Sequence, residues 1–178
     1  MYAALLRGVN LGALNRMKMP ELRAFVEGLG CTDVSTYLQS GNVVFRSDRA
    51  AGALRRSIEQ GIGSELGLDI PVVIRSRRQL EQLVAGNPFG RPKEKENMLY
   101  VTFLAEKPER ERLRRLVEES FAPERFELVG QDVYLYVPNG YGRSKLSNAL
   151  LERRLGVPAT TRNWRTVTAL AELAAAAG

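Results

Sequence analysis

The most informative absence in this 178-residue sequence is histidine, which does not occur at all. Imidazole is the general base of Ser-His-Asp and Cys-His catalytic arrangements, so neither arrangement can exist in this chain. Histidine ligands for zinc are excluded for the same reason. Any general base must therefore be a carboxylate, a lysine, a tyrosine, a cysteine or a group on a ligand.

Cysteine and long apolar runs are also scarce. The single cysteine, Cys31, excludes an intrachain disulfide and a thiolate zinc site, so we expect no metal and no cofactor. No apolar run approaches the roughly 20 residues that a membrane helix needs. The first predicted strand begins almost at Met1, which leaves no room for a secretory signal. These features predict a cytoplasmic protein without a membrane partner.

Charge is not concentrated in any one part of the chain. The formal net charge is +6, and residues 1–86 and 87–178 carry +3 each. An excess of this kind permits an anionic partner but does not demand one. An arginine-rich surface without a specific partner explains the same composition.

The clearest structural signal that is present lies between Asp33 and Arg46. Two runs of β-branched and aromatic residues flank Ser40-Gly41-Asn42, which is typical of a β-hairpin. Alternation predicts that Val34 and Leu38 lie on the same side as Val43 and Phe45.

The elements around this hairpin follow a recognisable order. The pattern predicts strand, helix, strand, strand, helix and strand, which is the ferredoxin-like order βαββαβ. Besides the hairpin, these elements are a strand at 2–7, a helix from 20 to 29, a helix at 54–66 and a strand at 70–75.

A segment rich in proline, glycine and alternating charge, residues 86–97, separates the two halves and reads as a linker. We therefore predict an α+β fold with a ferredoxin-like subdomain at 1–85 and a second subdomain at 98–178, built as βαββ followed by two helices. No residue-level repeat is evident between the halves. The second half contains strands at 98–105, 126–129 and 132–137 and helices at 108–121, 145–155 and 163–175.

Three segments are rich in hydrogen-bond donors at predicted helix starts, namely residues 8–18, 138–147 and 159–164. Free backbone N–H groups and the helix dipole favour an anion at such places. Arginine adds a planar fork suited to phosphate or carboxylate. The candidate ligand-binding residues are Arg7, Asn10, Arg16, Lys18, Arg143, Ser144, Lys145, Thr161 and Arg162.

Each of these segments also has a purely structural interpretation. Glycines at loop–helix junctions mostly serve backbone geometry. Thr161 or Asn163 is the kind of residue that caps a helix, and Trp164 can attach the last helix to the core. The two interpretations predict different surroundings for the same side chains.

Several short stretches together resemble a known bacterial family, the one catalogued as domain of unknown function 1697. The resemblance spans essentially the whole chain and implies an α+β fold of two subdomains, the first ferredoxin-like. It implies no activity and no catalytic residue. The stretches are Leu-Leu-Arg-Gly-Val-Asn-Leu-Gly near the start, Lys-Met-Pro-Glu-Leu before the first helix, Tyr-Leu-Gln-Ser-Gly-Asn-Val-Val-Phe in the hairpin, Ser-Lys-Leu at 144–146 and Ala-Thr-Thr-Arg-Asn-Trp at 159–164.

The leading hypothesis from the sequence is a binding protein for an anionic ligand such as a nucleotide, phosphate or nucleic acid. The residues from 7–18 would form one wall of its cleft and those from 143–162 the other. An enzyme of transferase or hydrolase type, using a lysine, a tyrosine or a carboxylate, is the first alternative. A protein–protein interaction module with an exposed apolar patch or a dimer across an open sheet face is the second. The oligomeric state stays open.

Overall fold

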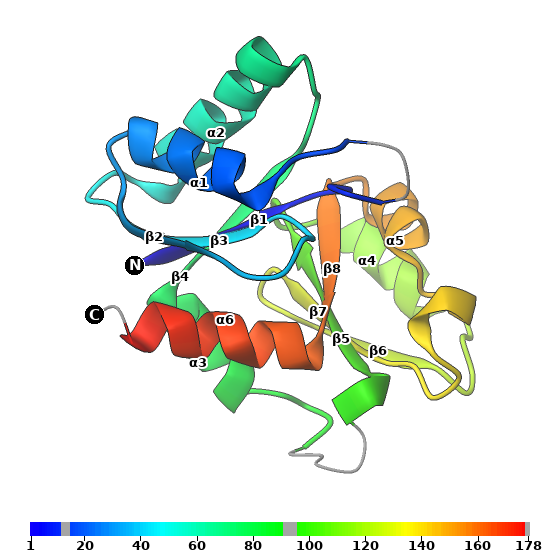
Figure 1. Cartoon of the computed structure of the whole chain (residues 1–178). Coiled ribbons are helices and arrows are strands. Elements are labelled where there is room, and N and C mark those ends of the chain that lie inside the picture. The colour runs from blue at the N-terminus through cyan, green and yellow to red at the C-terminus, as the bar shows by residue number, and fades with distance from the viewer. Residues whose placement is uncertain (12–14, 91–95, 177–178) are drawn as a thin grey trace. The chain divides into compact units, whose positions relative to one another are not determined.

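The computed structural model describes residues 1–11, 15–90 and 96–176 (Figure 1). Residues 12–14 of the predicted donor-rich loop and residues 91–95 of the predicted linker lie outside this part. Contacts divide the chain into two compact units, residues 1–82 with 169–178, and residues 83–168. The limits 1–85, 86–97 and 98–178 remain a prediction.

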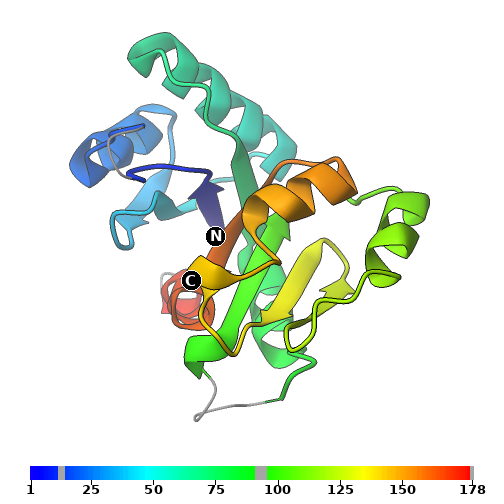
Figure 2. The ribbon, with the colours of Figure 1, turned by 90° about the vertical axis from the view of Figure 1, so that its right-hand side faces the viewer.

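The first unit contains the predicted βαββαβ order. Its four strands form one antiparallel sheet in the order β2-β3-β1-β4. Both helices cover the same face of this sheet (Figures 1 and 2). The elements are β1 (Tyr2–Leu6), α1 (Met19–Gly28), β2 (Thr32–Thr36), β3 (Asn42–Arg46), α2 (Ala51–Leu66) and β4 (Val72–Ser76), followed by α3 (Arg77–Ala85).

The hairpin predicted from the sequence is present, and Val34, Val43 and Phe45 face the helices in the core as expected. The prediction for Leu38 was wrong, because this residue has left the strand and is 57% exposed. The connection is longer than a two-residue turn, and Leu38 adopts a φ of +56°. Gly41 ends the loop at a φ of +71°, where an added Cβ would lie 2.8 Å from Cβ of Leu6. Only glycine fits at this position.

The second unit has its own four-stranded antiparallel sheet, in the order β6-β7-β5-β8. The α4 and α5 helices pack on one of its faces around a separate apolar core. The elements are η1 (Glu96–Met98), β5 (Leu99–Leu104), α4 (Arg110–Val117), β6 (Arg125–Val129), β7 (Asp132–Tyr136), η2 (Tyr141–Arg143), α5 (Asn148–Leu155) and β8 (Ala159–Asn163). The last helix, α6 (Trp164–Ala176), begins in this unit, and its residues from 169 onward belong to the first unit.

The β8 strand adds an element that the sequence interpretation did not contain. Residues 159–163 precede a helix as expected, but they pair with β5 along their whole length, from Tyr100↔Asn163 to Leu104↔Ala159. The apolar pattern of the sequence does not predict this strand, because Ala159 is its only apolar residue and Thr160 and Arg162 occupy buried positions. The second unit is therefore also βαββαβ followed by a helix. Within the described ranges, no helix is long and apolar enough to cross a membrane.

Candidate functional site

The connection between β1 and α1 in the first unit is held together by Asn10. The side-chain amide of Asn10 donates to the carbonyls of Met17 (2.8 Å) and Gln39 (2.7 Å), and its Oδ1 accepts from the Met17 backbone N–H at 2.9 Å. Asn10 has a φ of +56°, a conformation that asparagine tolerates better than most residues. The polar groups of Asn10 thus shape the loop, in agreement with the structural interpretation of this residue.

The basic residues of the same connection differ in exposure. Arg7 is half-buried at the end of β1, where its backbone N–H donates to Pro71 at 2.9 Å. Arg16 is exposed. Lys18 forms an ion pair of 3.2 Å with Glu21 through side chains that are 82% and 55% exposed. An ion pair this exposed contributes at most about 1 kcal/mol to stability, so Lys18 can leave Glu21 for another anion at little cost. Arg16 and Lys18 are therefore the cations that this connection presents to solvent.

The connection between β7 and α5 in the second unit surrounds a carboxylate, that of Glu124. The Ser144 hydroxyl donates to Glu124 Oε2 at 2.9 Å. The backbone N–H groups of Lys145 and Leu146 donate to Oε1 at 3.3 Å and to Oε2 at 3.2 Å. Glu124 is only 8% exposed. Three donors of this predicted segment are therefore used by a carboxylate of the protein itself, and binding of an external anion there stays a prediction.

Side chains on the two sides of this segment have different surroundings. Ser144 is extended, with φ −69° and ψ 136°, so the side chains of its two neighbours in the chain point away from the side that Ser144 faces. Ser144 and Leu146 point inward, and Leu146 is completely buried. Arg143 and Lys145 are exposed. Their Cα atoms, two residues apart in an extended chain, are about 7 Å from each other. The segment thus presents a pair of cations outward while Glu124 secures its inner side.

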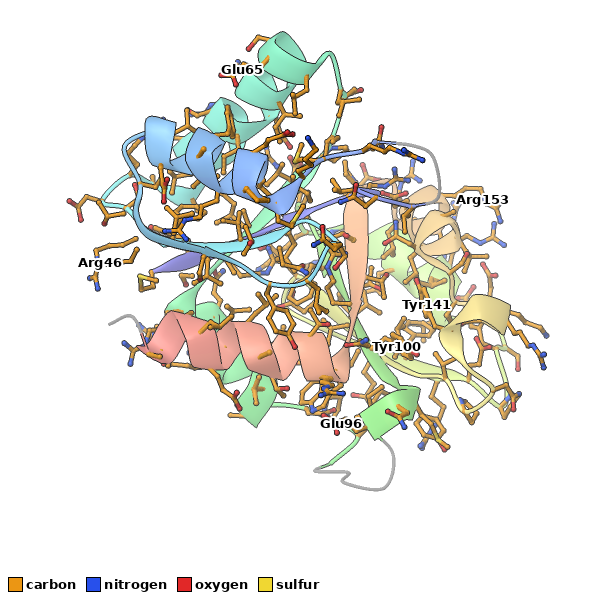
Figure 3. All side chains as sticks on the ribbon, in the orientation of Figure 1. Arg46, Glu65, Glu96, Tyr100, Tyr141 and Arg153 are labelled. Carbon is orange, nitrogen blue, oxygen red and sulfur yellow. The ribbon has the colours of Figure 1, made fainter. Side chains whose placement is uncertain are left out.

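Thr161, on β8, belongs to a partly buried polar cluster. Its hydroxyl donates to Asn148 Oδ1 at 3.0 Å, and it lies 2.8 Å from the hydroxyl of Thr102, which acts as the donor to it. The ring of Tyr141 stacks on Tyr100 with centroids 4.8 Å apart (Figure 3). Burial raises the pKa of the Tyr141 phenol, an effect that Thr161 and Asn148 partly offset. This phenol is therefore neutral at pH 7.

Arg162 follows Thr161 on β8 and so points to the opposite face of the sheet. Its Nη1 donates to the Thr160 hydroxyl at 2.7 Å and to the Thr161 carbonyl at 3.0 Å. Burial lowers the pKa of Arg162 to about 10, which keeps the guanidinium charged at pH 7. Thr161 and Arg162 were predicted to line the same wall, but the strand directs them to different faces.

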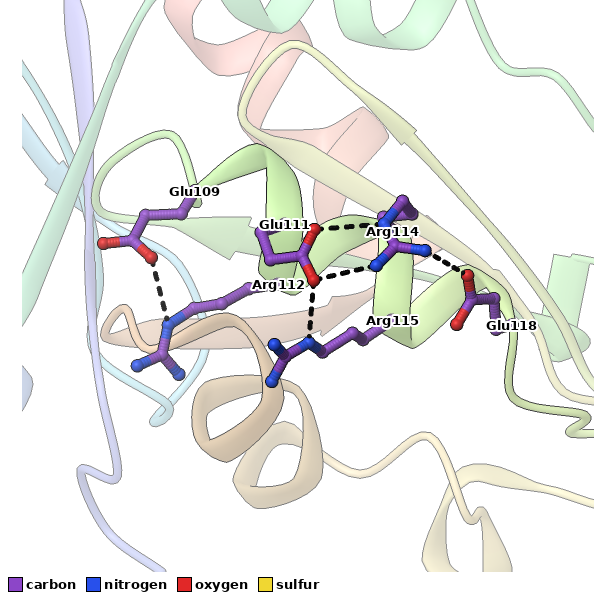
Figure 4. A network of polar contacts seen from close by, with 6 residues as sticks. All are labelled: Glu109, Glu111, Arg112, Arg114, Arg115 and Glu118. Atoms are coloured by element: carbon purple, nitrogen blue, oxygen red, sulfur yellow. Dashed lines mark hydrogen bonds and ion pairs between the residues drawn. The ribbon is translucent and has the colours of Figure 1, made fainter.

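The arginines of α4 are satisfied largely by glutamates of the same region (Figure 4). Glu111 accepts hydrogen bonds from Arg114 and Arg115, and Arg114 also pairs with Glu118. The bonds from Arg114 and Arg115 hold the pKa of Glu111 below its ordinary value. The exposed face of α4 thus carries charges that are paired with one another and solvated.

Other reactive groups show no activation. Burial raises the pKa of the Cys31 thiol, against smaller opposite effects of Ser47 and Arg49. Burial also raises the pKa of Tyr134 to about 12. In the part of the chain that the structure describes, no three Cys, Asp or Glu side chains gather where they could hold a metal ion.

Comparison with known proteins finds a matching family and a solved structure of similar fold. The family described as "Protein of unknown function (DUF1697)" matches residues 1–134. The conserved bacterial protein SP0830 from Streptococcus pneumoniae has a similar solved structure, with a TM-score of 0.76 and 21% sequence identity over 97% of each chain. No curated protein matches the chain.

Proposed function

Because this chain belongs to the DUF1697 family of proteins of unknown function, its role has to be inferred from its own residues, and we propose that it binds a phosphate-bearing anionic ligand. The ligand would be a nucleotide, inorganic phosphate or a nucleic acid. We assign the contact in the second unit to Arg143 and Lys145. Arg16 and Lys18 are the corresponding candidates in the first unit.

The observation that carries this proposal is the carboxylate of Glu124 inside the 143–146 segment. Three donors hold it, so the backbone there is already fixed before any ligand arrives. A preorganised backbone lowers the entropy cost of binding. The two exposed cations, whose Cα atoms are about 7 Å apart, can then each contact an oxygen of one polyphosphate, or neighbouring phosphates of a nucleic acid strand.

The contacts of the candidate side chains lead us to propose a smaller set of ligand contacts than the sequence did. Ser144 holds Glu124, Asn10 holds its own loop and Thr161 belongs to a partly buried cluster. We therefore regard these three as residues that support the binding segments and not as direct ligand contacts. Arg7 and Arg162 are less exposed than Arg143 and Lys145, which makes them weaker candidates.

The enzyme alternative receives less support from the described residues. A tyrosine that acts as a base needs a pKa near neutrality, whereas those of Tyr134 and Tyr141 are raised. RNA binding through aromatic side chains on the open face of a ferredoxin-like sheet is a further alternative, and it is also less favoured. In the first sheet, the face turned away from α1 and α2 carries buried side chains, among them Ala3, Leu5 and Val44.

The proposal is tested by calorimetric titration at low salt with ATP, inorganic phosphate and a single-stranded oligonucleotide. The double variant Arg143→Ala/Lys145→Ala should weaken binding of the preferred probe about tenfold or more, since charge-assisted bonds are lost. An oligonucleotide held by these two cations should show a slope of log K against log salt of about −1.4.

The matched control is Lys107→Ala/Arg110→Ala, which removes the same charge from exposed positions of the same unit. It should leave binding within about twofold, as expected for screened charges outside the site. An equal loss in both double variants would mean that only net charge matters, and the assignment to Arg143 and Lys145 would be abandoned.

A further inference from the structure

A groove runs between α1 and α2 in the first unit, far in sequence from the residues proposed to bind anions in the second. Its volume is about 530 Å³, within the range of small-molecule sites. Most of the lining is apolar, and the side chains come from the end of the β1–α1 connection and from both helices. The lining residues include Met17, Leu22, Phe25, Leu29, Ile62 and Leu66.

Two glycines shape this groove, one by admitting the Phe25 ring and one by leaving the groove open. Gly61 on α2 lets the Phe25 ring lie against the helix backbone, since an added Cβ would be only 2.4 Å from Phe25 Cζ. Gly28 on α1 lines the groove, and an added Cβ there would meet nothing within 4 Å. Leu66, at the end of α2, is 46% exposed and adds apolar surface to the lining of the groove.

The charged residues that line this groove are both acidic, although the protein as a whole is basic. They are Glu21 on α1 and Glu65 on α2. Glu21 forms an ion pair with the exposed Lys18. Glu65 forms no ion pair with any residue that the structure describes, and it lies on α2 in the same unit (Figure 3). A ligand with an apolar body and a positive group matches this combination, whereas a fatty acid does not.

The geometry points to this groove as a binding site for a small cationic amphiphile, that is, an alkyl or aryl amine. The apolar part lies over Phe25 between the helices, and the ammonium group lies beside Glu65. This site is separate from the proposed anion site and does not depend on it. A second copy of the chain and a neutral or acidic lipid are the competing occupants, and the experiment distinguishes them.

The first measurement is a calorimetric series with butyl-, hexyl- and octylammonium on the full chain, with octanol and octanoate as matched probes. Each buried methylene should raise affinity about fourfold until the groove is full. Octylammonium should bind more tightly than octanol and much more tightly than octanoate. Binding that does not depend on chain length, or octanoate binding as tightly as octylammonium, would overturn the inference.

The second measurement compares two glycine variants. Gly28→Leu fills the groove from an open position and should weaken octylammonium binding at least about tenfold, while the fold gains from a better helix former. Gly63→Leu makes the same change on an exposed position of α2 that does not line the groove, and it should leave affinity unchanged.

The third comparison tests the charge. Glu65→Gln should weaken octylammonium about threefold to fivefold and leave octanol unaffected, as expected for a partly exposed ion pair. If Glu65→Gln changes neither probe, the acidic rim plays no part and the ligand class is wrong. Sedimentation of the wild type and Gly28→Leu completes the test, because a dimer lost in the variant would assign the groove to a second copy of the chain.

Discussion

The two units have the same order and pairing of strands, and they differ in which connections between helices and strands are long. In the first sheet β1 pairs with β4 from Tyr2↔Ser76 to Leu6↔Val72, and in the second β5 pairs with β8 from Tyr100↔Asn163 to Leu104↔Ala159. Both sheets have the same strand order, counted within each unit. The sequence predicts that both halves begin as βαββ, but it shows no residue-level repeat because few side chains correspond.

One correspondence does survive at the level of side chains. Arg75 lies opposite Ala3, and Arg162 lies opposite Val101 at the equivalent register. Each guanidinium donates from Nη1 to the carbonyl of the preceding residue, at 3.0 Å in both cases. Both arginines are buried. The same backbone position therefore accommodates a buried arginine in both units.

The difference between the units lies in their connections. The first unit has its long connection between β1 and α1, residues 7–18, where the second has only residues 105–109. The second unit has its long connection between β7 and α5, residues 137–147, where the first has only residues 47–50. Two of the three donor-rich segments found in the sequence are these extensions. The residues of these two long connections, which have no counterpart in the other unit, are thus the better candidates for a functional role.

The largest effect should come from removing the carboxylate that secures the second unit's extension. Glu124→Ala leaves the Ser144 hydroxyl and the Lys145 and Leu146 N–H groups without their acceptor. Buried donors left unsatisfied cost about 1–3 kcal/mol each, so a loss of about 3 kcal/mol in the free energy of unfolding is expected. Urea denaturation measures it.

Glu127→Ala is the control, because Glu127 is an exposed glutamate on β6, the strand that begins directly after Glu124. It should change stability by no more than about 0.5 kcal/mol. A Glu124→Ala protein as stable as wild type would show that the extension does not need its internal anion, and the proposed preorganisation would fail.

A smaller effect concerns Tyr134, which stands opposite Val101 where the first unit has Val44 opposite Ala3. Its hydroxyl donates to the Leu83 carbonyl at 2.9 Å, and Tyr134→Phe should cost about 1 kcal/mol at pH 7. The pKa is raised to about 12 from 10.0, mainly by burial and less by Asp132. The phenol therefore stays protonated in the folded state while it ionises in the unfolded chain.

This difference predicts the sign of a pH effect. Below pH 10 the wild type keeps its full stability from Tyr134, and between about pH 10 and 12 it loses on the order of 2 kcal/mol. Tyr134→Phe should lack this part of the alkaline loss, so the wild type's advantage disappears as pH rises and the two stability curves cross before about pH 12. Parallel curves from pH 8 to 12 would contradict the assignment of the raised pKa to Tyr134.

The smallest effect is expected on the exposed helix faces of both units. Glu111→Gln removes bonds from Arg114 and Arg115 in the second unit, and Glu27→Gln removes the Arg23 ion pair in the first. Both should leave thermal unfolding at neutral pH without measurable change, because exposed pairs are screened. The pKa of Glu111 is lowered, so any contribution it makes is present at neutral pH and disappears as pH falls. A clear drop in stability at pH 7 would count against this ranking.

Much of the fold could be predicted because apolar spacing follows secondary structure. The strands and helices around Val43, Phe45 and Ile58 carry clear periodicity and lie in the core. The β8 strand could not be predicted this way, because its buried positions are occupied by Thr160 and Arg162. Polar strands give no apolar signal when hydrogen bonds, and not apolar contacts, satisfy their buried side chains.

The candidate site shows the same limit. The donors of the 143–146 segment were visible in the sequence, but their acceptor, Glu124, lies about twenty residues earlier with no local pattern to mark it. Likewise the role of Thr161 follows from its pairing with Thr102 across the sheet. Partners that meet only through folding cannot be read from a single sequence.

The most direct test of the anion site follows backbone amide signals by nuclear magnetic resonance during titration with phosphate and ATP. The account predicts saturable shifts at residues 143–146 of the wild type that disappear in Arg143→Ala/Lys145→Ala and persist in Lys107→Ala/Arg110→Ala. Saturable shifts confined to other residues, or none at concentrations up to about 10 mM, where binding of even a few kcal/mol becomes visible, would contradict it.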